Sequence, residues 1–251
     1  MGVFEGKVTI VTGAGSGIGR ATVELVAREG GSVVGVDLQG SPLVEDERVA
    51  WVTGDVTEET VNNQAVEMAI ERFGGVDSVV LNAGMSRRGS ITDLSMDDFD
   101  RVMNLVVRAT ALGMRAAVPA LEARGGGSIV ATASTSGLGG DTGMWAYNTG
   151  KAGVINLVRS AALDLGVRNI RVNAVAPGPT ETAMTERIQQ APEIHDELRR
   201  RMALQRWGQP EEVAAAIAFL LSPAASFITG VVLPVDGGLS ANSGQFYPAG
   251  D

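Results

Sequence analysis

Tyr147 and Lys151 stand four residues apart in the chain. On a helix this spacing puts two residues on one face, with about 5–6 Å between their Cβ atoms. A tyrosine hydroxyl is a poor base at neutral pH, but a neighbouring ammonium favours the phenolate and lowers its pKa. Such a tyrosine can take a proton from an alcohol or return one to a carbonyl oxygen. Taken alone, the pair is better explained as a core tyrosine beside a solvated lysine than as a catalytic pair. Other motifs of the chain are therefore needed to choose between the two interpretations.

A glycine-rich turn follows the short apolar run Val8–Val11, which is typical of a buried strand. Its glycines stand at positions 13, 15, 17 and 19, and a helical pattern then runs as far as Ala27. Such a turn can bind a diphosphate, because glycines let the backbone approach and the helix N-terminus offers free N–H groups. It is not a P-loop, since Arg20 follows Gly19 where Lys would stand, and its spacing differs from G-x-G-x-x-G. Nucleotide binding is therefore favoured over a turn without a ligand.

Asp37 directly follows the next apolar run, Ser32–Val36. An acidic residue about 20 positions beyond such a turn can accept hydrogen bonds from an adenosine ribose. The same carboxylate would repel a 2′-phosphate, and neither Leu38 nor Gln39 is a cation that could neutralise one. The sequence therefore predicts NAD as the cofactor and disfavours NADP.

Apolar strands alternate with helical stretches along the whole chain. The strands are predicted at Lys7–Thr12, Ser32–Val36, Val49–Thr53, Val76–Leu81, Ser128–Ala133, Ile170–Val175 and Val231–Pro234. The longer helices are predicted at Glu59–Phe73, Asp97–Glu122, Ala146–Leu165 and Glu211–Leu220. This alternation predicts a three-layer, doubly wound α/β fold with a parallel sheet, formed by one domain over residues 1–251. Ligands of such sheets bind beyond the carboxyl ends of the strands.

The composition narrows the function further. A net charge of −9 argues against nucleic acids and anionic membranes as partners. We expect a cytoplasmic protein, because the chain enters a predicted strand too early for a signal peptide and has no apolar run long enough to cross a membrane. With no cysteine and His195 as the only histidine, a metal centre is disfavoured, and we expect His195 on a solvated helix face. A serine hydrolase is disfavoured because no G-x-S-x-G motif occurs.

Taken together, these motifs resemble the short-chain dehydrogenase/reductase family, and the resemblance covers nearly the whole chain. It rests on Thr12–Gly19, Asp55-Val56, Asn82-Ala83-Gly84, Ser134, Tyr147 with Lys151, and Pro177–Thr182, all in the order and spacing of the family. The resemblance implies a seven-stranded Rossmann sheet and an NAD-dependent oxidoreductase that interconverts a secondary alcohol and a ketone. A sugar-nucleotide epimerase fits poorly, because those relatives are longer.

The resemblance also implies roles for individual residues. Tyr147 is the acid/base, Ser134 holds the substrate oxygen thirteen residues earlier in the chain, and Lys151 tunes Tyr147 and holds the nicotinamide ribose. The cofactor contacts implied are Gly13, Ser16, Gly17, Ile18, Asp37, Leu38, Asp55, Val56, Asn82, Ala83, Gly84, Tyr147, Lys151, Pro177, Gly178, Thr180 and Thr182.

One position departs from the family pattern. Most members carry a fourth catalytic residue, an asparagine, where this chain has Val106. Asn104 lies two residues earlier, about 200° around a regular helix, and is expected to face elsewhere. The departure keeps an alternative open, a nucleotide-binding or regulatory protein on a degenerate dehydrogenase scaffold.

The substrate and the assembly are less well defined by the sequence. The pocket candidates are Met85, Ser86, Arg87, Thr142, Met144 and Trp145, and a helical lid is expected over Met184–Leu204, extending to about residue 207. The arginines near this pocket leave an anionic or polyhydroxylated alcohol open as the small-molecule substrate. By resemblance, the two long helices and the C-terminal strand form subunit contacts, so a homotetramer is expected.

Overall fold

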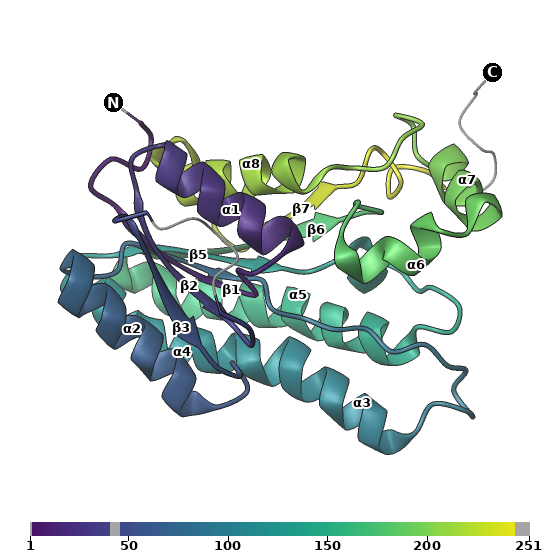
Figure 1. Ribbon diagram of the computed structural model, residues 1–251, viewed down its shortest axis with the longest axis horizontal. Coiled ribbons are helices and arrows are strands. Elements are labelled where there is room, and N and C mark those ends of the chain that lie inside the picture. Colours follow the sequence, from purple (N-terminus) through teal and green to yellow (C-terminus); the bar gives the residue numbers. More distant parts are fainter. Residues whose placement is uncertain (1, 41–45, 244–251) are drawn as a thin grey trace.

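The computed structural model describes residues 2–40 and 46–243 (Figure 1). These residues form a seven-stranded sheet in the order β3-β2-β1-β4-β5-β6-β7, in which every neighbouring pair is parallel. The strands are β1 (Val8–Thr12), β2 (Ser32–Asp37), β3 (Val49–Thr53), β4 (Ser78–Leu81), β5 (Gly127–Thr132), β6 (Ile170–Pro177) and β7 (Val232–Val235). The predicted doubly wound α/β fold is confirmed, and so are the seven strands that the resemblance implied.

Helices cover both faces of the sheet (Figure 1). They are α1 (Gly17–Arg28), α2 (Glu59–Phe73), α3 (Met96–Met103), η1 (Asn104–Arg108), α4 (Ala109–Ala123), η2 (Thr135–Gly137), α5 (Trp145–Leu165), η3 (Gly166–Arg168), η4 (Ala183–Thr185), α6 (Glu186–Gln189), α7 (Pro192–Arg201), α8 (Pro210–Leu221) and η5 (Pro223–Ala225). Helices α1 and α8 lie on one face, while α2, α4 and α5 lie on the other.

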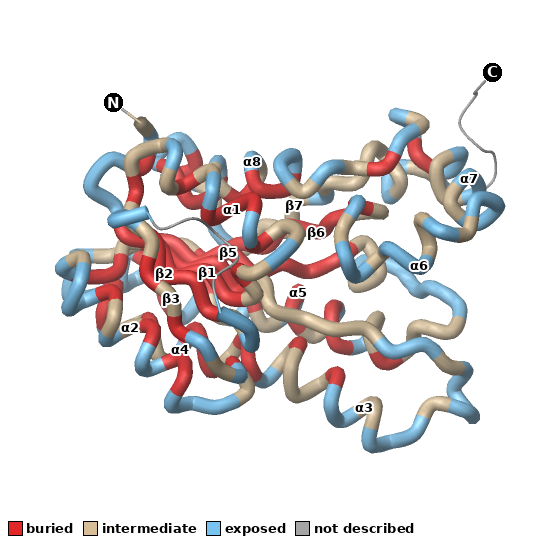
Figure 2. The backbone as a smooth tube through the Cα atoms, in the orientation of Figure 1, coloured by how far each residue is buried: buried red, intermediate tan, exposed pale blue. Residues whose placement is uncertain are grey.

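The sheet separates two hydrophobic cores. Successive side chains of a strand point to opposite faces, so Ile10 packs into the core under α2, α4 and α5, whereas Val11 packs into the core under α1 and α8. All five residues of β1 are buried. Figure 2 shows the strands as the buried centre of the molecule. Because both faces are covered, the strands are continuous apolar runs rather than alternating ones.

The order of the strands creates a crevice between β1 and β4. The chain runs outward from β1 through β2 to β3 and then returns to form β4 on the other side of β1. The segments that follow the two strands therefore diverge at their carboxyl ends. This topological switch point is where ligands bind in open parallel sheets.

Strand β4 starts two residues later than predicted, at Ser78. The reason is Asp77, whose carboxylate accepts a hydrogen bond from the Val8 backbone N–H at 3.0 Å and pairs with Arg124 at 3.0 Å. These polar contacts fix the entrance to the strand.

The helix predicted over Asp97–Glu122 is interrupted. A five-residue π-helix, η1, separates α3 from α4. The extra residue per turn leaves carbonyls without their usual partners, and the Thr110 hydroxyl donates to the Val106 carbonyl at 2.7 Å. Short π segments inside α-helices are frequent at functional sites. Residues of η1 indeed reach the cavity described below.

The segment that follows β6 contains η4, α6 and α7, as the predicted helical lid requires. Its base is fixed by a parallel bridge between Thr180 and Gly208. His195 is not on a solvated face as expected: its ring stacks on that of buried Trp207, with centroids 4.8 Å apart and planes 10° apart. The correction arises because α7 folds back onto the returning chain.

Among the described residues, no helix combines the length and the apolar composition that crossing a bilayer requires.

Candidate active site

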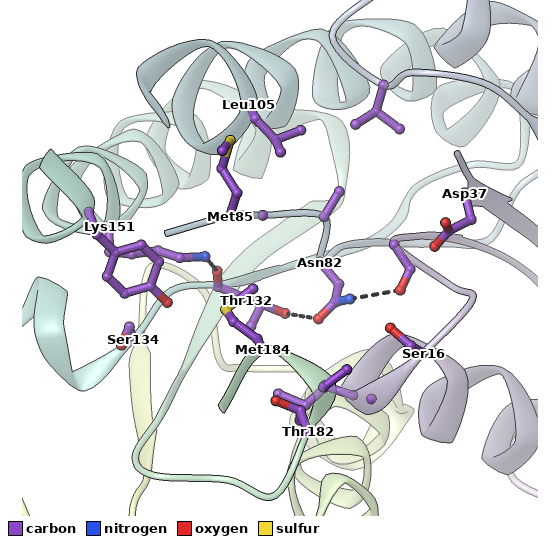
Figure 3. A pocket seen from close by; sticks show the side chains of 18 of the residues that line it. Ser16, Asp37, Asn82, Met85, Leu105, Thr132, Ser134, Lys151, Thr182 and Met184 are labelled. Atoms are coloured by element: carbon purple, nitrogen blue, oxygen red, sulfur yellow. Dashed lines mark hydrogen bonds between the residues drawn. The ribbon is translucent and has the colours of Figure 1, made fainter. Parts of the chain in front are cut away.

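A cavity of about 530 Å³ runs along the carboxyl ends of the strands (Figure 3). Its volume lies within the range of about 300–1,000 Å³ that is usual for small-molecule and cofactor sites. The structure brings every residue predicted for the site into its lining: Gly13, Ser16, Gly17, Ile18, Asp37, Leu38, Asp55, Val56, Asn82, Ala83, Gly84, Ser134, Tyr147, Lys151, Pro177, Gly178, Thr180 and Thr182. Their individual roles stay predictions.

The glycine turn has the shape of an anion cradle. Gly13 and Gly17 have φ angles of 63° and 51°, a conformation that side-chain-bearing residues rarely adopt. A Cβ on Gly17 would lie 3.1 Å from the Thr182 side chain, so a larger residue would fill the space between the turn and the segment after β6. Helix α1 begins here without an acidic residue in its first turn and without a side-chain cap from Ser16. Its free N–H groups suit a diphosphate.

Asn82 braces the turn from the neighbouring strand. Its side-chain amide donates to the Gly13 carbonyl at 3.2 Å and its oxygen accepts from the Thr132 hydroxyl at 3.1 Å, as Figure 3 shows. The Asn82 backbone N–H in turn bonds to the Thr12 hydroxyl at 3.0 Å. One side chain thus ties together the carboxyl ends of β1, β4 and β5.

Asp37 lies at the opposite end of the cavity from Ser134 and Lys151 (Figure 3). Its carboxylate accepts hydrogen bonds from the backbone N–H groups of Gly15 at 2.8 Å and Gln39 at 3.3 Å. No cation of the described residues pairs with it. The carboxylate is therefore held in place by the backbone and keeps its charge for a ligand.

Ser134 and Lys151 lie at the other end of the cavity (Figure 3), and Tyr147, which is hydrogen-bonded to Ser134, also lines it. Ser134 follows β5, and the other two lie in the first two turns of α5. Lys151 is only 4% exposed, and its Nζ donates to the Thr132 carbonyl at 2.6 Å. The ammonium lies 5.7 Å from the centroid of the Tyr147 ring. The predicted sharing of one helix face is confirmed.

The expected lowering of the Tyr147 pKa is not found. Burial raises the pKa of Tyr147 and outweighs the hydrogen bond from Ser134, which lowers it, while the Asp141 carboxylate raises it further. Burial also lowers the pKa of Lys151 from 10.5 to about 8. The physical reason is that the ammonium is drawn to Thr132 rather than to the phenol, so burial dominates. Burial thus favours the protonated phenol of Tyr147 over the phenolate.

Asn104 lines the cavity although the sequence analysis left it out. It lies on the face that turns toward Thr57, whose carbonyl accepts from Arg108 at 2.8 Å, and Arg108 also donates to Asn104 at 3.3 Å. Val106 faces away from the cavity as a 1% exposed core residue packed against Gly150. The expectation that Asn104 faces elsewhere is therefore wrong, because the π-helix η1 turns its side chain toward the cavity and that of Val106 into the core.

Further residues of the lining were not predicted. They are Val36, Gly54, Thr57, Arg101, Leu105, Thr132, Ala133, Ala183 and Thr185. Several of them stand one or two positions in the sequence from a residue that was predicted, and this neighbourhood is the only feature of the sequence that indicates them. No feature of the sequence indicates Arg101 and Leu105, because the direction of their side chains depends on how η1 joins α3 to α4.

Of the six pocket candidates, only Met85 lines the cavity; Met184, from the predicted lid, lines it too. Trp145 instead stacks on Phe99, with ring centroids 5.0 Å apart, and donates to the Ser90 carbonyl at 3.1 Å. Arg87 lies 3.6 Å from the Asp98 carboxylate. Ser86, Thr142 and Met144 also lie outside the lining. These residues shape the surroundings of the cavity rather than its wall.

Comparisons with known proteins agree with this geometry. A family model described as Enoyl-(Acyl carrier protein) reductase matches residues 13–240. A probable short-chain type dehydrogenase/reductase of Bradyrhizobium diazoefficiens is 41% identical, with 100% of this chain and 93% of that protein covered. The meso-2,3-butanediol dehydrogenase of Serratia marcescens is 39% identical, with 96% of this chain and 98% of that protein covered.

A solved structure gives the same answer for the fold. The ligand-free aldohexose dehydrogenase of Thermoplasma acidophilum matches with a TM-score of 0.91 at 31% identity, and the match covers 98% of each chain. The chain therefore belongs to the short-chain dehydrogenase/reductase family of oxidoreductases.

Proposed function

We propose that the protein is an NAD-dependent oxidoreductase that interconverts a secondary alcohol and a ketone, with Tyr147 as the acid/base. The observation that carries the proposal is the layout of one cavity. A glycine cradle and the charged Asp37 lie at one end, and the Ser134, Tyr147 and Lys151 side chains converge at the other. The relatives named for dehydrogenation of butanediol and aldohexose support a small hydroxylated substrate.

The bound nicotinamide would supply the acceptor for a hydride, that is, for two electrons and one hydrogen. In alcohol oxidation Tyr147, as phenolate, takes the hydroxyl proton while the carbinol carbon gives up its hydride. Ser134 would hold the substrate oxygen beside the phenol, and Lys151 would hold the ribose of the cofactor. In ketone reduction Tyr147, as phenol, returns the proton to the carbonyl oxygen. Burial raises the pKa of Tyr147 and so favours the phenol, the form that donates the proton in reduction.

Asp37→Asn is expected to weaken the preference for NAD. The substitution removes the charge that would accept ribose hydrogen bonds and repel a 2′-phosphate. Because hydrogen bonds to a charged group contribute about 1.5–3 kcal/mol, kcat/KM with NAD should fall by about 10- to 100-fold, while kcat/KM with NADP should rise. The measurement is initial-rate kinetics with each cofactor. Asp46→Asn, which removes an exposed carboxylate paired with Arg48, is the control. Equal use of both cofactors by the unmodified protein would contradict the assignment of NAD.

Val106 favours a second candidate, a nucleotide-binding or regulatory protein on a degenerate dehydrogenase scaffold. Its side chain is buried and offers no amide, and its carbonyl already accepts from Thr110. The appearance of reduced nicotinamide across a panel of secondary alcohols, and its loss with the matching ketones, separates the two candidates. Turnover on any of them supports the enzyme. Tight NAD binding without turnover on the whole panel supports the binding protein.

We also propose that the protein acts as a homotetramer in the cytoplasm. Large apolar side chains remain exposed on the described surface, with Leu163 at 82%, Val167 at 91% and Phe227 at 103%. Self-association would remove them from water. Light scattering should give about four times the chain mass of 26.0 kDa. A mass of one chain would contradict the proposal.

A further inference from the structure

Asp141 is linked to the catalytic serine through one intervening residue. The backbone N–H of Ser136 donates to the Ser134 hydroxyl oxygen at 3.1 Å, and the Ser136 hydroxyl donates to Asp141 Oδ2 at 2.6 Å. Ser136 belongs to the short helix η2, which Ser134 caps. Two consecutive hydrogen bonds therefore link the Asp141 carboxylate to Ser134, although Asp141 itself lies outside the lining of the cavity.

The charge of Asp141 is not neutralised within the described residues. It forms no ion pair there, and its second oxygen, Oδ1, accepts no hydrogen bond from them. The side chain is exposed and close enough to Tyr147 to raise the pKa of that phenol. The carboxylate thus disfavours the phenolate that alcohol oxidation requires. A charge that opposes catalysis in this way is expected to have a compensating use in binding.

Asn148 lies on α5 and contacts the loop that carries Asp141. Its side-chain N–H donates to the Asp141 carbonyl at 3.0 Å, which holds the loop against α5. Its Oδ1 is buried and has no donor among the described residues. An unsatisfied buried acceptor costs about 1–3 kcal/mol. The Asn148 oxygen is closed to a ligand by its burial, so the exposed Asp141 carboxylate is the acceptor that remains open to a hydrogen-bond donor of a ligand.

The surroundings offer little to an anionic substrate. Arg101 lines the cavity but is paired with Asp98 at 3.4 Å, and Arg87 lies outside the lining at 3.6 Å from the same carboxylate. Exposed apolar side chains also occur here: Met184, which lines the cavity, is 55% exposed, and Leu138, which follows η2, is 44% exposed. An unpaired carboxylate linked to Ser134 would repel a negatively charged substrate and attract a hydroxyl or an ammonium.

We propose that Asp141 is a specificity-determining residue that accepts a hydrogen bond from a second donor group, a hydroxyl or an ammonium, on the substrate. The substrate class is then a diol or an amino alcohol and the corresponding hydroxyketone or aminoketone, rather than an anionic alcohol. This inference rests on the proposed function, since it concerns the substrate of the same site. Oxidation of the diol follows the same balance, with one proton passing to Tyr147 and one hydride to NAD.

Asp141→Asn tests the proposal, because it removes the charge but keeps an oxygen for Ser136. The kcat/KM values for 2,3-butanediol, 1-amino-2-propanol and 2-butanol are measured with NAD for the unmodified protein and the variant. The unmodified protein should prefer one of the first two over 2-butanol. In the variant this preference should fall by about 10- to 100-fold, mainly through KM, with little change for 2-butanol. A loss confined to the diol identifies a hydroxyl as the donor, and a loss confined to the amino alcohol identifies an ammonium.

Asp164→Asn, which removes an exposed carboxylate near the far end of α5, is the matched control and should change no ratio. Thermal unfolding of each variant checks that it is folded. Two results would overturn the role of Asp141 and leave the proposed function standing. One is turnover by Asp141→Asn with an unchanged ratio of kcat/KM for the diol or the amino alcohol to kcat/KM for 2-butanol. The other is a preference of the unmodified protein for hydroxycarboxylates over diols. No turnover of any alcohol or ketone by the unmodified protein would overturn the proposed function, and this inference with it.

Discussion

Tyr147→Phe is expected to lower the kcat of NAD-linked alcohol oxidation by about 10²- to 10⁴-fold, the usual contribution of a positioned acid/base. The substitution removes a single oxygen and keeps the ring, so packing against α5 and the cavity wall is preserved. Ser134 would still hold the substrate oxygen, but no group would take its proton. The loss should appear in kcat, while binding of NAD, followed by fluorescence quenching, should change little.

Thr149→Ala provides the control for this experiment. Thr149 lies on the exposed face of the same helix, two residues beyond Tyr147, and does not line the cavity. Its substitution should leave the rate within about twofold, as expected for a surface change away from the site. Retention of most of the rate by Tyr147→Phe would show that another group moves the proton.

Lys151→Met is expected to abolish most activity and at the same time to stabilise the fold. The ammonium near the phenol and the ribose site would be lost, and removal of one such electrostatic group costs about 10²- to 10³-fold in kcat. The gain in stability comes from burial, which lowers the pKa of Lys151 from 10.5 to about 8. A pKa change of this size corresponds to about 3 kcal/mol of destabilisation when the lysine is charged. Loss of the hydrogen bond to Thr132 offsets about 1 kcal/mol, leaving a net gain of about 2 kcal/mol.

The gain in Lys151→Met should depend on pH in a defined direction. Below pH 8 the lysine is protonated in both the folded and the unfolded chain, so the full cost of burying its charge is present. Between about pH 8 and pH 10.5 the unfolded chain binds a proton that the folded chain has released, so the unmodified protein becomes more stable as the pH rises. Urea unfolding should therefore show a larger advantage for the variant at pH 7 than at pH 10. If the stability advantage of Lys151→Met is equal or larger at pH 10, the pKa of Lys151 is not lowered by burial, which would contradict the account.

The fold could be predicted from the sequence because a parallel sheet covered on both faces needs continuous apolar strands. Val8–Thr12 and Val49–Thr53 show this, since each was predicted with bounds that match or lie within one residue of the structure. The interruption of the long helix by η1 could not be predicted. A π segment leaves the hydrophobic periodicity almost unchanged, yet it decides that Asn104 faces the cavity and Val106 the core.

The residues of the candidate site could be predicted, but their electrostatics could not. Spacing alone places Tyr147 and Lys151 on one helix face. It does not reveal that the ammonium bonds to the Thr132 carbonyl on a different element, or that burial raises the pKa of the phenol. Asp141 was missed for a similar reason. Its contact with Ser136 depends on how a loop folds back beside η2, and no motif marks that loop.

A secondary alcohol with deuterium on its carbinol carbon tests the central claim most directly. The account predicts that the deuterium passes to the reduced nicotinamide when the protein oxidises this alcohol with NAD, and that Tyr147→Phe suppresses the transfer. Mass spectrometry of the isolated cofactor measures it. Reduced cofactor without deuterium, or bound NAD that is never reduced by any alcohol, would contradict the account.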